Sequence, residues 1–542
     1  MHAIPRWVWG AAMLLGVLRM APYAVAALRT PPGWEFSGNL TVSPDYMQYR
    51  TWARQTQVEG PIVSDRFTAE PTSRFLPVPL YWGIGALAGV TGLTPEWVYA
   101  WLGVPLTIAM VLLLYVVIRR FLRDPVAVRW VFWATVLGGG LGALLLLVEE
   151  TPLRTIHPLY KLFVEPIESP ALVIPFERYR GNYVVQALLD THFLAFWVAA
   201  TAAMLALVEA TLAPARRRLL VMGALFAGAT ILHVYEGVTL LAITAGVVAV
   251  CLRRGLPRRD AAALLATATA SVAVVLVGML LLQRGSGYPT PEWRGLMVAP
   301  AILLLAYPVA WLLLAVGGIR FWQEATREGA LLVGWVVGCL ALVLAGPFFP
   351  YPDRGTMTLQ IPLMIIAGLI YFRDRSRVRP RDAMLLVLLS APTLVHRAFN
   401  IAGERFDPAS AHIWLGPAHR HVLDTLLARA TRDDLLVADA VSLRWLGPEY
   451  VGRHYAGHFF LTIRYPEKRA ALEGFLAATD AEAQRAFLAE SGATLLFVPA
   501  GHDPARVAAL PGVQPLVAES VGTLFAVDTL AIQRPVESSD AG

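Results

Sequence analysis

The chain has 542 residues, of which 56% are hydrophobic and 15% are charged, and its formal net charge is +6. A soluble domain carries about 25% charged residues, so this composition argues against an ordinary soluble enzyme. Cys251 and Cys339 both lie in apolar runs, which argues against a disulfide scaffold or a cysteine-ligated zinc site. The expected fold class is mainly α: a polytopic α-helical membrane protein with a small C-terminal α/β domain.

About eleven apolar stretches are candidate transmembrane helices. In chain order they are Trp7–Leu28, Trp97–Ile118, Val126–Val148, His192–Leu212, Leu219–Ile231, Val238–Leu252, Ala261–Gln283, Val298–Val316, Ala330–Gly346, Leu359–Phe372 and Ala383–Ala398. Phe75–Leu93 is also apolar, but prolines and glycines interrupt it. Counting it as a span would invert every later loop, so we expect it to lie along the membrane surface or to enter as half a helix.

Every second short connection is rich in arginine, which predicts the orientation of the chain. The positive-inside rule places these connections, and with them the N-terminus, in the cytoplasm. The first span ends in Ala24-Val25-Ala26, a triplet similar to a signal-peptidase site, but its long apolar run favours retention. Arginine in place of lysine is typical of a GC-rich bacterial genome and thus of a bacterial inner membrane. The arginines are Arg119, Arg120, Arg123, Arg216, Arg217, Arg218, Arg253, Arg254, Arg258, Arg259, Arg320, Arg327, Arg373, Arg375, Arg377, Arg379 and Arg381.

The composition divides the chain into residues 1–399, a transmembrane domain with long outer loops at 29–96 and 149–191, and residues 400–542, a soluble extracytoplasmic domain. The second part loses the long apolar runs. Its periodicity alternates between helix and strand, which favours an α/β domain. The expected helices are His419–Ala430, Pro466–Ala478 and Ala481–Glu490, and the expected strands are Leu435–Ala440, Thr494–Pro499 and Thr523–Val527.

The first outer loop contains the sequence Ser-Pro-Asp-Tyr-Met-Gln-Tyr at residues 43–49. Asp45 follows the first span closely enough to lie at the membrane surface, and the aromatic rings of Tyr46 and Tyr49 suit the apolar face of a sugar. The alternatives are a solvated loop carboxylate and tyrosines of an interfacial belt. Asp65 and Glu70 in the same loop are weaker candidates.

Three further outer-side positions carry polar candidates. Arg354 and Tyr351 lie in a short connection between two spans, where a guanidinium suits phosphate oxygens. The alternative is pairing of Arg354 with its loop neighbours or a helix cap. The second long loop carries Glu165, Glu168, Glu177, Arg178, Arg180 and Asp190, to which no roles are assigned, and His192 begins the next span.

The sequence His233-Val-Tyr235-Glu236 lies where one apolar run passes into the next. His233 and Glu236 would share a helix face. Ionisable groups at membrane depth are costly and mark pathways or sites, so we expect these residues, with Tyr235 and His192, to bind substrate. The alternative is a turn whose polar groups face water.

With a first span, a long outer loop with an early Asp, a proline-containing surface segment and many further spans, the chain resembles the GT-C glycosyltransferases. These include protein mannosyltransferases and aminoarabinose transferases. The segment GRHYAGHFFLT at residues 452–462 is also similar to one in bacterial proteins grouped with this superfamily. The resemblance implies a polyprenyl-phosphate sugar donor, a lipid, glycan or protein acceptor, and Asp45 as general base.

The chain departs from the family pattern in ways that bear on metal binding. Tyr46 follows Asp45 where the commonest version has a second acidic residue, and no DxD triplet occurs. We therefore expect no metal and no cofactor, with a divalent metal left as the alternative.

Other apparent motifs carry no function. Gly138–Ala143 matches a dinucleotide pattern but lies inside a span, where small residues such as Gly334 and Gly338 favour close helix packing. No P-loop is present. The arginines lie between apolar runs rather than on one soluble face, so membrane lipids and not nucleic acid are the expected partners.

The leading functional hypothesis is an outer-face membrane glycosyltransferase. The alternatives are a transporter or flippase for a lipid-linked glycan, and a scaffold whose C-terminal domain binds a partner. A transporter favours related halves and charges near the middle of its spans. In this sequence the unusual residues instead gather at the outer ends of spans.

Overall fold

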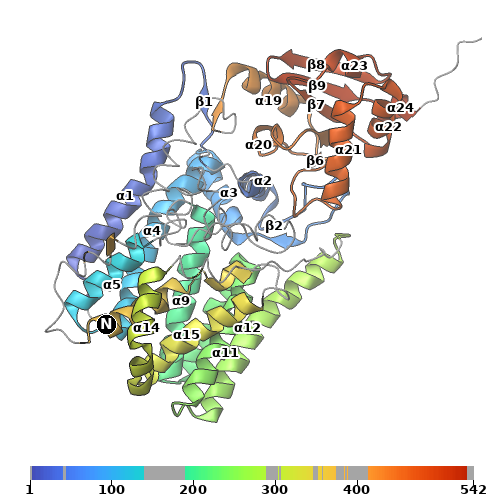
Figure 1. Ribbon diagram of the computed structural model, residues 1–542. Helices are drawn as coiled ribbons and strands as arrows, with labels where there is room; N and C mark the ends of the chain where they lie inside the picture. The colour runs from blue at the N-terminus through green and yellow to red at the C-terminus, as the bar shows by residue number, and fades with distance from the viewer. Residues whose placement is uncertain are drawn as a thin grey trace, which may run out of the picture. The chain divides into compact units, whose positions relative to one another are not determined.

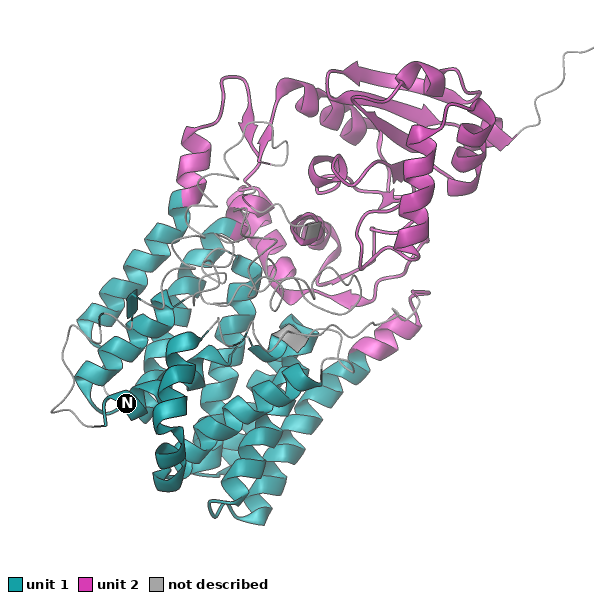
Figure 2. Ribbon diagram, in the orientation of Figure 1, with its two compact units in different colours: residues 1–21, 100–278, 292–402 teal, residues 22–99, 279–291, 403–542 magenta. Residues whose placement is uncertain are grey.

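The computed structural model describes residues 3–38, 44–138, 190–288, 307–345, 352–373 except Met357, and 413–533, with Leu40, Leu303, Met384, Val387 and Leu388 as isolated positions. The chain divides into two compact units (Figure 2). Unit 1 comprises Met1–Ala21, Ala100–Gly278 and Glu292–Ala402, and unit 2 comprises Pro22–Tyr99, Met279–Pro291 and Gly403–Gly542. Unit 2 thus combines the loop after the first span with the C-terminal segment, while the expected boundary at residue 399 stays a prediction.

Within the described residues, seven helical segments are long and apolar enough to cross a membrane. They are α1 (Arg6–Leu28), α4 (Pro95–Phe121), α9 (Thr191–Leu212), α11 (Val234–Leu252), α12 (Arg258–Arg284), α15 (Arg327–Leu344) and the segment Arg354–Tyr371, which contains η4 (Pro352–Thr356) and α16 (Gln360–Tyr371) (Figure 1). Each corresponds to a predicted span. The expectation of a helical multi-pass membrane protein is confirmed.

Three further helices overlap other predicted spans: α5 (Pro125–Leu137) and α14 (Pro308–Glu324) overlap in part, and α10 (Arg216–Leu232) contains the whole predicted span Leu219–Ile231. The rest of the predicted span Val126–Val148 and most of Ala383–Ala398 lie outside the described residues. The number of spans therefore stays a prediction.

Helices α11 and α15 of unit 1 pack backbone against backbone. A Cβ atom at Gly338 would lie 2.5 Å from the carbonyl oxygen of Ala242, and one at Gly334 would lie 2.5 Å from the Cα of Val247. Gly246 on α11 completes the contact, since its Cβ would lie 2.4 Å from the carbonyl oxygen of Gly334. The predicted role of Gly334 and Gly338 in close helix packing is confirmed.

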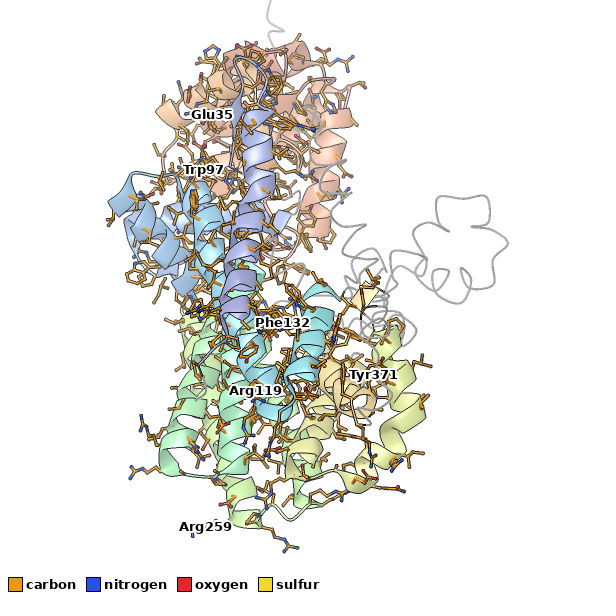
Figure 3. The ribbon with its side chains drawn as sticks, turned by 90° about the vertical axis from the view of Figure 1, so that its left-hand side faces the viewer. Glu35, Trp97, Arg119, Phe132, Arg259 and Tyr371 are labelled. Atoms are coloured by element: carbon orange, nitrogen blue, oxygen red, sulfur yellow. The ribbon has the colours of Figure 1, made fainter. Side chains whose placement is uncertain are left out.

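The arginine-rich connections meet at one end of the unit 1 helices. Arg120 at the end of α4 bonds Glu209 near the end of α9 (2.7 Å) and Glu328 at the start of α15 (2.8 Å). Arg327 donates to the carbonyl oxygen of Gly255 after α11 (2.9 Å), and Arg373 after α16 pairs with Glu324 of α14. Two of the predicted cytoplasmic arginines, Arg119 and Arg259, are labelled in Figure 3. The shared end fits the predicted alternation of loops, while the cytoplasmic assignment stays a prediction.

In unit 2, helix α2 (Pro44–Glu59) packs on α3 (Pro79–Thr91). The approach is close because Gly85 lacks a Cβ, which would lie 2.5 Å from the carbonyl oxygen of Ala53. With 13 residues, α3 is short for a span, as expected for the segment Phe75–Leu93. Two short antiparallel pairs accompany these helices: β2 (Ile62–Val63) with β3 (Leu76–Pro77), and β1 (Glu35–Phe36) with β4 (Trp414–Leu415).

The C-terminal part of unit 2 is a five-stranded mixed sheet with helices, in the order β6-β5-β7-β9-β8. The strands are β5 (Leu435–Val437), β6 (Arg453–His454), β7 (Leu495–Pro499), β8 (Val513–Glu519) and β9 (Gly522–Val527). The helices are α19 (Pro417–Arg429), α20 (Leu443–Leu446), α21 (Tyr465–Ala477), α22 (Ala481–Ser491), α23 (Pro504–Ala508) and α24 (Thr529–Gln533). The predicted helices and strands of this region coincide with α19, α21, α22, β5, β7 and β9.

Candidate functional site

Asp45 lies in the first turn of α2 and pairs with His458 of the same unit. The Oδ1 atom of Asp45 is 3.1 Å from Nε2 of His458, although 413 residues separate them in the chain. The Asp45 side chain is 40% exposed, whereas that of His458 is 1% exposed. A buried imidazole thus holds a carboxylate that is accessible from outside the unit.

The backbone selects the tautomer of His458. The amide N–H of Phe460 donates to Nδ1 of His458 (3.2 Å), so Nδ1 is the unprotonated, accepting nitrogen. In the neutral imidazole the proton then lies on Nε2. His458 therefore donates to Oδ1 of Asp45 and orients its carboxylate.

The segment that carries His458 is fixed by the loop that contains Phe67. The backbone N–H of His458 donates to Oγ1 of Thr462 (3.0 Å), and that hydroxyl donates to the carbonyl oxygen of Phe67 (2.5 Å). The Phe67 ring stacks on His454 with a centroid separation of 5.7 Å. Burial lowers the pKa of His454 from 6.5 to about 4, so this second histidine stays neutral and acts in packing.

Tyr46 and Tyr49 belong to a buried aromatic cluster of unit 2. The Tyr49 ring stacks on Tyr81 of α3 at 5.3 Å, and Tyr46 makes an edge contact with Tyr99 at 5.2 Å. Both tyrosines are buried, and in this structure Tyr49 packs on α3 while Tyr46 packs on Tyr99 at the start of α4. Their binding of a sugar stays a prediction.

The weaker candidates Asp65 and Glu70 lie on either side of Thr68. Asp65 is buried, and its Oδ1 accepts the N–H of Phe67 (2.8 Å), while burial raises the pKa of this carboxyl from 3.8 to about 7. Lys468 donates to both carboxylate oxygens of Glu70 (2.8 and 2.6 Å), and this pairing contributes to a lowered pKa of Glu70. Through Thr68 and Glu70, which both bond Lys468, this loop is tied to α21.

Unit 1 contains a second polar cluster, at the end of its helices opposite the arginine-rich connections. His233 separates α10 from α11, and its ring stacks on Phe196 of α9 at 4.4 Å. Nδ1 of His233 is 3.7 Å from Oε1 of the buried Glu236. The Tyr235 ring lies 5.3 Å and the His192 ring 5.9 Å from that of His233. The structure therefore brings together the four residues predicted to bind substrate, which are His192, His233, Tyr235 and Glu236.

The prediction that His233 and Glu236 share a helix face is wrong in its geometry. His233 has extended backbone angles (φ −157°, ψ 110°) and precedes the first turn of α11. The two side chains still approach each other, because a residue at this position lies beside the first turn of the helix that follows.

Arg354 of η4 belongs to the same cluster. Its guanidinium carbon lies 5.3 Å from the centroid of the Phe193 ring of α9, and it is close enough to His233 for an electrostatic interaction. Tyr351, predicted to bind phosphate beside Arg354, lies outside the described residues. So does the second long loop with Glu165, Glu168, Glu177, Arg178 and Arg180, whereas Asp190 caps α9 by accepting the N–H of His192 (2.9 Å).

Two residues of these clusters were not assigned roles from the sequence. Arg19 of α1 is buried and donates to Oγ1 of Thr191 (2.7 Å), in the first turn of α9. Arg19 could have been predicted as a candidate from the sequence, because it is a charged residue within an apolar run. His458 lies in the segment singled out at residues 452–462, but no local pattern links it to Asp45.

No group of three or more His, Cys, Asp or Glu side chains that could hold a metal ion occurs among the described residues. Cys251 and Cys339 are both buried and free. The expectation of no metal stays a prediction, since the described part of the chain is all that was searched.

No protein-family model and no curated protein sequence matches the chain. Among solved structures it is similar to the archaeal oligosaccharyltransferase AglB from Archaeoglobus fulgidus in complex with an inhibitory peptide and a dolichol-phosphate. That likeness has a TM-score of 0.46 and 10% identity and covers 97% of this chain and 75% of the other. It is also similar to the arabinofuranosyltransferase AftD from Mycobacteria (TM-score 0.49, 15% identity), where it covers 97% of this chain and 40% of the other. Likenesses at this level leave the function to be argued from the site.

Proposed function

We propose that the chain is a membrane glycosyltransferase that moves a sugar from a polyprenyl-phosphate donor to a lipid, glycan or protein acceptor, with Asp45 as the general base. The observation that carries the proposal is the pair formed by Asp45 and His458. A buried donor holds an exposed carboxylate in one orientation, which is the arrangement required of a base that meets its substrate at a surface.

The proposed reaction uses Asp45 to accept the proton of an acceptor hydroxyl. As that proton moves to the carboxylate, the hydroxyl oxygen forms a bond to the anomeric carbon of the sugar. The bond from that carbon to the phosphate oxygen breaks, and the polyprenyl phosphate leaves with the electron pair. His458 contributes by holding the carboxylate in one orientation before the proton arrives.

A lipid-phosphate leaving group requires stabilisation of its negative charge. In unit 1 we assign this part to Arg354, whose guanidinium can pair with phosphate oxygens in a bidentate manner. We assign His192, His233, Tyr235 and Glu236 to the binding of substrate beside it. The aromatic and imidazole rings around Arg354 reduce its hydration, which strengthens any charge pairing it makes.

The test is transfer of sugar from a panel of radiolabelled polyprenyl-phosphate sugars to membrane lipids, glycans and peptides by the purified protein and its variants. Asp45→Asn keeps the shape of the side chain and removes the base, so we expect transfer to fall by about 10²–10⁴-fold. Asp503→Asn, which changes an exposed capping carboxylate of α23, is the matched control and should retain full activity.

His458 is tested in the same assay as a positioning residue. His458→Gln retains a side-chain N–H donor and should keep most of kcat, whereas His458→Leu removes the donor and should lower kcat by about 10²-fold. KM should change little in either variant. Normal turnover by Asp45→Asn would overturn the assignment of the base. Absence of transfer from every donor, with labelled lipid moved across liposome membranes, would favour the transporter instead.

A further inference from the structure

Unit 2 carries an exposed aromatic tip formed by Phe459 and Phe460. Their side chains are 39% and 48% exposed, and their ring centroids lie 4.0 Å apart. The turn beneath them is fixed, because the N–H groups of Leu461 and Thr462 both donate to the carbonyl oxygen of His458 (3.2 and 2.8 Å). Two adjacent apolar rings held outward on a rigid turn indicate a contact surface.

The tip is attached to the segment that follows helix α12. The hydroxyl of Tyr288 donates to the backbone carbonyl of Leu461 (3.1 Å) and lies 3.4 Å from that of Phe460. Tyr288 comes shortly after Arg284, the last residue of α12. The tip therefore lies at the level at which this candidate span ends.

The last turns of α12 show that apolar surface continues to this level. Leu280 and Leu281 are 54% and 62% exposed. At 1.5 Å per residue the 27 residues of α12 extend about 40 Å, longer than the roughly 30 Å apolar core of a bilayer. The exposed leucines suit acyl chains, and Arg284 suits the headgroup region beyond them.

We propose that the Phe459–Phe460 tip inserts into the boundary between headgroups and acyl chains of the leaflet at which α12 ends. The partner is the lipid surface itself. Insertion removes the apolar surface of both rings from water, which favours the membrane-bound position. Because the N–H of Phe460 donates to Nδ1 of His458, the same contact holds the Asp45–His458 pair at the membrane surface.

The lipid contact can be tested without measuring enzyme activity. Phe460→Cys and, separately, Phe459→Cys are labelled with the environment-sensitive fluorophore NBD in the full-length protein. The native Cys251 and Cys339 are buried, so background labelling should be low. The labelled proteins are reconstituted into vesicles of phosphatidylethanolamine and phosphatidylglycerol, with or without a lipid that carries a spin label near the headgroup end of its acyl chain.

Two controls calibrate the signal. Leu281→Cys on α12 reports a position expected to face lipid. Arg506→Cys on α23, which lies at the other end of unit 2 from Met279–Pro291 (Figure 2), reports an aqueous position.

We expect the labels at Phe460 and Phe459 to lose fluorescence with the spin-labelled lipid, as the label at Leu281 does, and to resist quenching by aqueous iodide. The proposal would be overturned if iodide quenched the labels at both positions and the spin-labelled lipid did not, as expected for the label at Arg506. The proposal would also be overturned if iodide quenched the labels at the tip and a soluble acceptor sugar then protected them. That result would favour a surface on which a sugar stacks. Because none of these outcomes depends on turnover, they stand apart from the test of glycosyl transfer.

Discussion

The hydrogen bond from His458 orients the Asp45 carboxylate, and further hydrogen bonds hold His458 in place. The N–H of Phe460 fixes the proton of His458 on Nε2, and the hydroxyl of Thr462 connects the same turn to Phe67. The His458 side chain is nearly fully buried. In the proposed reaction this carboxylate would have its orientation set before substrate binds, which would lower the entropic cost.

Asp65 makes the stability of unit 2 depend on pH. Burial raises its pKa from 3.8 to about 7, against the opposing hydrogen bond from the N–H of Phe67. The folded state thus holds the proton more tightly than the unfolded state, so the carboxyl contributes stability at low pH that is lost as pH rises through about 7. Such a difference in pKa corresponds to a loss on the order of 4 kcal/mol.

Asp65→Asn should remove this dependence. The Asn side chain keeps an oxygen for the N–H of Phe67 but cannot ionise, so the variant should be the more stable protein at pH 8.5 and not at pH 5. The measurement is the melting temperature of both proteins in detergent across this pH range. If the melting temperatures of variant and wild type changed in parallel with pH, the pKa of Asp65 would not be raised in the folded protein.

At the scale of elements, the contact of α11 with α15 depends on the absence of side chains. The Cβ that Gly338→Ala adds would meet the backbone of Ala242 and Ile243 at 2.5 Å, and backbone atoms cannot move aside as a flexible side chain can. We expect separation of the helices and a loss of about 1–3 kcal/mol of stability, measured as a lower melting temperature.

Gly228→Ala is the matched control for that variant. Gly228 lies inside α10, and nothing comes within 4 Å of the Cβ it would gain. This substitution should be neutral or stabilise the protein by up to about 1 kcal/mol, because alanine is the better helix former. If both alanines had the same effect, close packing would not be the reason for Gly338.

The sequence predicts these helices better than it predicts the sites. Apolar runs define α9, α11 and α15 because a lipid-exposed or buried helix needs little else. Strand β8 was not predicted: Pro515 and a register shift between Pro515 and Val517 interrupt its pattern, and most of its residues are not buried. Asp45 could be found from its place after the first span. Its pairing with His458 could not, since that contact depends on the folding of segments 413 residues apart.

At the scale of the molecule, unit 1 separates its charges between the two ends of its helices. Helix α9 runs from His192, beside His233, to Glu209, which pairs with Arg120. One end thus collects arginines that pair with carboxylates across helices, and the other holds the aromatic and histidine cluster with Arg354. This separation fits the predicted topology, in which the arginine-rich end fixes the orientation of the chain in the membrane.

The orientation of the unit 1 helices in the membrane can be tested by labelling cysteines. If the arginine-rich end is cytoplasmic, Arg259→Cys at the start of α12 should react with a membrane-impermeant maleimide only after the inner membrane is broken. Arg469→Cys on the exposed face of α21 should react in intact spheroplasts. The buried native cysteines keep the background low, and Arg253, Arg254 and Arg258 remain to hold the orientation of the altered loop. The reverse labelling pattern would place Asp45 and Arg354 on the cytoplasmic side, where the donor would have to be presented on the inner leaflet.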